Sequence, residues 1–117
     1  MKLLAIVAVV AAGLAGCGGG TSFATYCDNF QAEQCAKVFE CTNPPPPDPT
    51  MWGVSVAQCT AMLKSANCAN ASSGQPCPGR ETYHSDKADA CLVDLKAATC
   101  DAFNAGFTSS NCASVCS

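Results

Sequence analysis

Charged side chains are scarce in this sequence, and basic ones are the scarcest. Only 13% of the 117 residues are charged, and six Lys and Arg stand against nine Asp and Glu. The basic residues form no cluster along the chain. A protein that binds nucleic acid or an anionic membrane surface through charge needs such a cluster. We therefore expect no nucleic-acid partner.

Histidine is almost absent, and the usual cysteine spacings of metal sites are missing. His84 is the only histidine, and no two cysteines are separated by two residues. Zinc sites and thioredoxin-like redox motifs both depend on that spacing. The pairs Cys112-x3-Cys116 and Cys35-x5-Cys41 could ligate a metal, but in an exported chain disulfides are the stronger interpretation. We expect no metal and no other non-covalent cofactor.

Large aliphatic side chains are few beyond the first sixteen residues. One domain of about a hundred residues needs more apolar surface than they supply for an ordinary core. We therefore expect other forces to stabilise the fold. The large aliphatic residues of this region are Val38, Met51, Val54, Val56, Met62, Leu63, Leu92, Val93, Leu95 and Val115.

No apolar run is long enough for a transmembrane helix, but a shorter one lies at the start. Leu3 to Ala15 is well below the length of about 20 residues that crosses a bilayer. A lysine precedes this run and small residues follow it, which is typical of a signal peptide. We assign residues 1–16 to that peptide.

The segment Leu14-Ala15-Gly16-Cys17 resembles the lipobox of bacterial lipoproteins, in which an aliphatic and two small residues precede a cysteine. The resemblance covers the first seventeen residues only. It implies cleavage between Gly16 and Cys17, a diacyl lipid such as palmitate on the Cys17 sulfur, and often acylation of the new amino group. The alternative is an ordinary secretory signal with a coincidental cysteine.

The lipobox resemblance also implies a location. The mature chain would be exported and lipid-anchored in the cell envelope, and Gly18, in place of an acidic residue, favours the outer membrane if the cell is Gram-negative. Residues 17–22 would then be the lipidated cysteine and a short, flexible Gly-rich tether. Five residues after the cysteine reach about 17 Å at most, so the domain of residues 23–117 would stay near the membrane.

The cysteine count agrees with the lipobox. Eleven cysteines are an odd number, and an odd cysteine in an exported chain needs an explanation. If Cys17 carries lipid, ten remain and can form five disulfides, which require an oxidising compartment. Each would contribute about 2–4 kcal/mol in place of a larger core. The ten candidates are Cys27, Cys35, Cys41, Cys59, Cys68, Cys77, Cys91, Cys100, Cys112 and Cys116.

Apolar spacing predicts an all-α fold, a small disulfide-stapled three-helix domain. The helices are expected near residues 23–40, 55–66 and 86–104, followed by a short C-terminal turn near 111–116. The helix near 23–40 is expected to have a single apolar stripe on one face, with Lys37 off that stripe. A proline run, which we expect to be extended, ends this helix. Ser55 and Gln58 form a capping-box pattern for the second, with Val54 and Cys59 as its staple.

Helix geometry constrains the disulfides. Nine residues along one helix span about 13.5 Å, so Cys91 and Cys100 cannot bond each other if that helix is continuous. An up-down-up order places Cys35 and Cys59 at similar heights, and we predict this pair. Cys27–Cys68 is compatible with it only if Asn67 ends the second helix. Cys100 is expected to bond Cys41 or one of the two last cysteines.

No residue pattern indicates catalysis. His84-Ser85-Asp86 has the residue types of a hydrolytic triad, but three consecutive side chains cannot align as nucleophile, base and orienting acid. A helix start explains Ser85 and Asp86 better, and His84 is then expected at the surface. We therefore predict that the chain is not an enzyme.

The leading functional hypothesis is a non-catalytic, lipid-anchored envelope lipoprotein with a structural or protein-interaction role, resembling small cysteine-rich lipoproteins without assigned function. Its partner would be an envelope protein or the cell wall. The alternative is a small disulfide-rich inhibitor or immunity-type binding protein. For that alternative, the segments 44–52 and 72–83 are the candidate binding loops.

Overall fold

The computed structural model describes residues 20–117, and this part of the chain is helical. A single antiparallel bridge joins Tyr83 to Cys116, and no strand occurs in the described range. The predicted all-α fold is confirmed. The helices are α2 Phe23–Cys41, α3 Pro49–Trp52, α4 Val56–Asn67, α5 Ser85–Ala97, α6 Cys100–Asn104 and α7 Ser110–Ala113.

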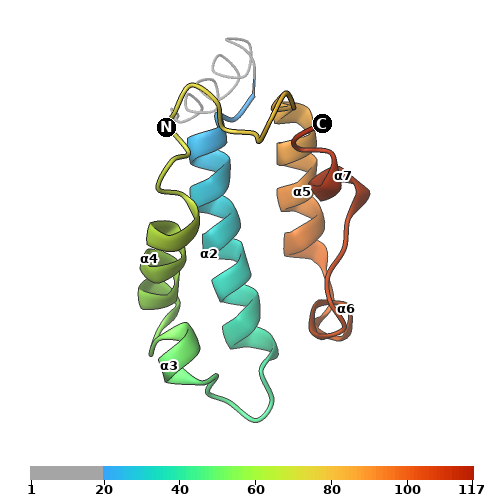
Figure 1. The fold of residues 1–117 in the computed structure, drawn as a ribbon. Helices are drawn as coiled ribbons and strands as arrows, with labels where there is room; N and C mark the ends of the chain where they lie inside the picture. Colours follow the sequence, from blue (N-terminus) through green and yellow to red (C-terminus); the bar gives the residue numbers. More distant parts are fainter. Residues whose placement is uncertain (1–19) are drawn as a thin grey trace, which may run out of the picture.

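Helix α2 lies in the middle, with α4 and α5 on opposite sides of it (Figure 1). The chain runs along α2, returns along α4 and runs along α5 in the direction of α2, as the up-down-up order predicted. The start of α2, the start of α5 and the C-terminus lie at one end of the domain, and α3 and α6 lie at the other. We call these the α2-start end and the α3 end.

The central position of α2 explains why its buried side chains do not form one stripe. Cys27, Gln31 and Cys35 face α4, where the two cysteines bond Cys68 and Cys59, and Gln31 accepts a hydrogen bond from the Asn67 amide at 3.2 Å. Lys37 and Cys41 face the α5–α6 side, where they contact Ala98 and Cys100. The expected single stripe is therefore wrong, because α2 has a neighbour on each side, and Lys37 is buried.

Helix α4 begins at the predicted capping box. The Ser55 hydroxyl accepts from the Gln58 N–H at 3.1 Å, and the Gln58 side chain accepts from the Val54 N–H at 2.7 Å. The predicted staple is wrong, because Val54 is 77% exposed and does not cover Cys59. The helix ends at Asn67, and Cys68 follows as its C-cap.

The third predicted helix is two helices. The segment 86–104 divides into α5 and α6, because Ala98 and Thr99 have extended backbones. The Thr99 hydroxyl accepts from the Ala102 N–H at 3.1 Å and so caps a new helix. The prediction of one continuous helix over residues 86–104 was therefore wrong beyond Ala97. Gly106, with a positive φ of 99°, follows α6 as expected.

The proline run ends α2 but is not extended. Residues 43–46 form a series of bends, and the peptide bonds Asn43–Pro44 and Pro45–Pro46 are cis. The expectation of an extended polyproline segment is wrong there. Asp48 then caps the short helix α3, which the sequence did not predict, by accepting from the Thr50 N–H at 2.9 Å.

The core is thin, and cysteines form most of it. Among the described residues, six of the eleven buried apolar ones are cysteines, and the large aliphatic residues in this set are Val38, Leu95 and Val115. Disulfides thus replace aliphatic packing, as the composition predicted. The five bridges are Cys27–Cys68, Cys35–Cys59, Cys41–Cys100, Cys77–Cys116 and Cys91–Cys112.

The pairings follow the helix order. Cys35–Cys59 is the bridge that the helix heights predicted, and Cys27–Cys68 is present beside it because α4 ends at Asn67. Cys100 bonds Cys41, one of its two expected partners, and Cys91 bonds a different segment. The bridges therefore join α2 to α4, α2 to α6, and α5 to α7.

Candidate functional site

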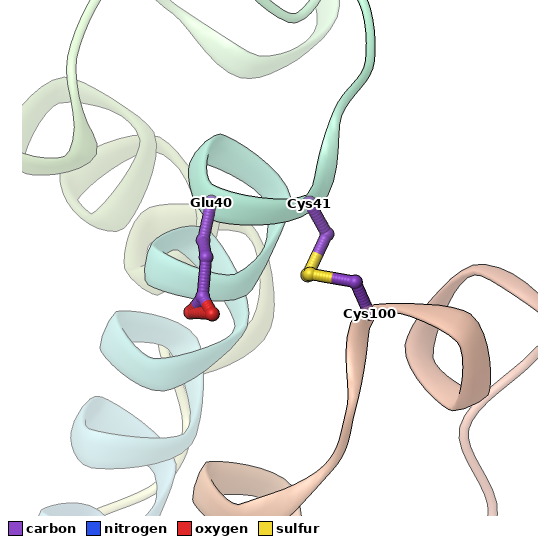
Figure 2. Close-up of side chains that lie close together, drawn as sticks. All are labelled: Glu40, Cys41 and Cys100. Atoms are coloured by element: carbon purple, nitrogen blue, oxygen red, sulfur yellow. A yellow bond between two sulfur atoms is a disulfide. The ribbon is translucent and has the colours of Figure 1, made fainter.

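Glu40, Cys41 and Cys100 are the described residues whose side chains come together in the manner of a metal site. Their ligand atoms lie within 4.8 Å of one another. Figure 2 shows that the two sulfur atoms are bonded to each other, at 2.08 Å, with the Glu40 carboxylate beside them. Cysteine binds metals as the thiolate, and a disulfide has none. This cluster is a covalent link between α2 and α6.

The other two cysteine pairs considered as metal ligands are also in disulfides, and each cysteine bonds a different partner. Cys112 and Cys116 bond Cys91 and Cys77, and Cys35 and Cys41 bond Cys59 and Cys100. Each pair therefore ties two different parts of the fold together.

His84-Ser85-Asp86 forms the start of α5. His84 is the N-cap residue, and its N–H donates to the Val115 carbonyl at 2.8 Å. Asp86 lies in the first turn, where a negative charge is favourable. We expected His84 at the surface, but its side chain is half-buried. His84 therefore connects the start of α5 to the C-terminal segment.

An aromatic cluster at the α2-start end was not anticipated from the sequence. Phe23, Tyr26, Phe30 and Tyr83 pack around Ala88, Cys91 and Val115, and the Phe23 and Tyr83 rings meet edge to face with centroids 5.3 Å apart. The Tyr26 hydroxyl donates to the Cys91 sulfur at 3.4 Å, and burial raises the pKa of Tyr26. The pattern Phe23, Tyr26, Phe30 on one helix was the available signal.

This end of the domain holds part of the expected tether. The Tyr83 hydroxyl donates to the Thr21 carbonyl at 2.5 Å, and Ser22 caps α2 by accepting from the Thr25 N–H at 3.2 Å. Thr21 and Ser22 therefore belong to the folded domain, and the expected flexible segment is wrong at these two residues. Gly16, Cys17 and the signal peptide lie outside the described residues.

Asp94 connects α5 to the segment that leads into α7. Its carboxylate accepts from the Ser109 hydroxyl at 2.7 Å and from the Asn111 side-chain amide at 3.0 Å. These two hydrogen bonds hold the pKa of the Asp94 carboxyl below its usual value. Asp94 also lines a cavity of about 350 Å³, together with the small residues Ala97, Ala98, Ala102 and Gly106 and with Phe107.

A second hollow of about 260 Å³ lies between α2 and α5, and we call it the α2/α5 groove. Its apolar residues are Ala32, Leu92 and Val93, and Val93 is 66% exposed. One acidic and one basic residue, Glu33 and Lys96, also line it, together with Asn29. An exposed apolar surface between opposite charges is a feature of protein-interaction sites.

The two candidate loops of the inhibitor hypothesis lie far apart. The segment 44–52 lies at the α3 end, and the segment 72–83 lies at the α2-start end (Figure 1). Both contain exposed residues, among them Met51 at 61%. The structure therefore does not bring these two candidate loops into one site.

Within residues 20–117, none of the helices has both the length and the apolar character needed to cross a bilayer. Comparison with known proteins finds no family model, no curated protein and no solved structure that matches the chain.

Proposed function

We propose that the chain is a non-catalytic lipoprotein of a bacterial cell envelope, anchored by lipid on Cys17, whose disulfide-stapled helical domain interacts with another protein or with the cell wall. The lipobox-like segment Leu14 to Cys17 supplies the anchor. The Gly18 that follows it favours the outer membrane in a Gram-negative cell.

The observation that carries this proposal is that all the cysteines except Cys17 are paired in disulfides. Ten of the eleven cysteines form five bridges, and the remaining one is Cys17. An exported chain with one cysteine left over requires a use for it. Cys17 stands where a lipoprotein carries its lipid. The cysteine count and the sequence motif therefore support the same role.

The bridges also support export. Five disulfides within 98 described residues form and persist in an oxidising compartment, outside the cytoplasm. They cross-link the helices and the C-terminal segment to one another, and surfaces held in this way bind partners at a low entropic cost. This favours an interaction role over one that depends on movement.

Mass spectrometry of the mature protein from a bacterial membrane tests the proposal. We expect an N-terminus at Cys17 with a diacylglyceryl thioether. The Cys17→Ser variant should retain residues 1–16 and carry no lipid, whereas Gly19→Ser, a control two residues away, should be processed normally. A free Cys17 thiol in the wild-type protein would overturn the proposal.

A further inference from the structure

We propose that the α2/α5 groove is a self-association surface, and that two copies of this chain pair there around a two-fold axis parallel to the helices. The groove presents Leu92 and Val93 between Glu33 on α2 and Lys96 on α5. The inference goes beyond the proposed function. It rests on that function only where it uses the membrane anchor to orient the two copies.

The groove contains charges that have no partner within the described chain. In residues 20–117 the ion pairs are Lys37–Glu40 and Lys64–Asp28, so Glu33 and Lys96 are not ion-paired there. Both line the same groove without meeting. Each is therefore available to a charge on a second molecule.

Glu33 and Lys96 lie at nearly the same height in the domain. The starts of α2 and α5 lie at one end, where the Tyr83 hydroxyl, just before α5, bonds the Thr21 carbonyl, just before α2. Glu33 is ten residues after Phe23, and Lys96 is eleven residues after Ser85. At 1.5 Å per residue these positions are about 15 Å and about 16.5 Å along two parallel helices.

Equal heights on parallel helices make the groove self-complementary. A two-fold axis parallel to the helices places α2 of one copy opposite α5 of the other, at the same height. Glu33 then faces Lys96 of the second copy, and Lys96 faces its Glu33. The apolar lining residues of the two grooves lie between these two charge pairs. An isologous interface needs this reciprocity, and an unrelated partner would not require it.

The same axis keeps the two attachment points together. Because it runs parallel to the helices, both α2-start ends point in one direction, and two lipid anchors would enter one membrane. The groove is small for a stable dimer, so the pairing is concentration-dependent. Confinement to a membrane surface raises the effective concentration of the second copy and favours the pairing.

Carbodiimide cross-linking of mixed isotopes tests the contact directly. Unlabelled and ¹⁵N-labelled mature protein, purified in detergent, are mixed and treated with a carbodiimide, which joins a carboxylate and an amine in contact as an amide. We expect a Glu33–Lys96 cross-link with one labelled and one unlabelled peptide. The Asp28–Lys64 pair, 3.5 Å apart within one chain, is the control and should give only same-isotope products.

Variants test the charge pattern by analytical ultracentrifugation. Glu33→Lys and Lys96→Glu should each weaken association about tenfold, because each changes two pairs per dimer. The double reversal should restore association. Val93→Asp should abolish it, and Val54→Asp, an exposed valine at the α3 end, should leave it unchanged.

A Glu33–Lys96 product that is only same-isotope, or a double reversal that fails to restore association, would overturn the proposal. The mass of the same preparation reports the state of Cys17. An unlipidated Cys17 would therefore count against the envelope lipoprotein without affecting the cross-linking result.

Discussion

The ammonium of Lys37 donates a hydrogen bond of 2.5 Å to the carbonyl of Ala98, across 61 residues of sequence. Ala98 is the C-cap of α5, where the last carbonyls of a helix lack intrahelical partners. A cation near them also complements the negative end of the helix dipole. One buried side chain of α2 therefore helps to end α5, next to the Cys41–Cys100 bridge.

Replacing Lys37 should destabilise the fold. In Lys37→Met the Ala98 carbonyl loses its donor while the apolar part of the side chain is kept, so we expect a loss of about 1–3 kcal/mol in the free energy of unfolding. Urea denaturation measures it. Lys64→Met is the matched control, since Lys64 is 43% exposed in its pair with Asp28 and should cost less than about 1 kcal/mol. Equal losses in the two variants would contradict the role of Lys37.

The Asp94 hydrogen bonds predict a loss of stability in acid. Because Ser109 and Asn111 lower the pKa of Asp94 in the folded state, the unfolded state binds more protons below the ordinary aspartate pKa of about 3.9. Stability is then complete above that pH and declines as the pH falls through the folded-state value. Asp94→Asn should flatten this decline in urea denaturation below pH 4. Glu81→Gln, at an exposed loop residue, is the control, and an equal flattening in both would count against the prediction.

Reduction of the disulfides should unfold the domain. Each bridge contributes about 2–4 kcal/mol, and within residues 20–117 the buried large aliphatic residues are only Val38, Leu95 and Val115. We expect a cooperative loss of the helical circular dichroism signal as reductant is added at neutral pH. The same protein with alkylator but no reductant is the control and should keep its signal. A reduced protein that still melts cooperatively on heating would show that the remaining core suffices.

Structural features that depend on near neighbours in the chain could be predicted from the amino-acid sequence. Apolar spacing located α2, and the proline run ended it. Ser55 and Gln58 marked the start of α4, because caps and helix breakers act within a few residues. Composition also required cysteines to replace a core. Helix heights were enough for Cys35–Cys59, since α2 and α4 lie antiparallel and in contact.

Features that depend on contacts between distant parts of the chain could be seen only in the folded domain. The break between α5 and α6 had a local signal in Thr99, a favourable cap residue, but the apolar stripe across it was equally consistent with one helix. The burial of Lys37 could not be predicted from the sequence, because it depends on the packing of α5 against α2. The bridge Cys77–Cys116 joins two irregular segments across 39 residues, where helix periodicity gives no position. Sequence patterns describe one helix face at a time, and the central helix of this fold has neighbours on two sides.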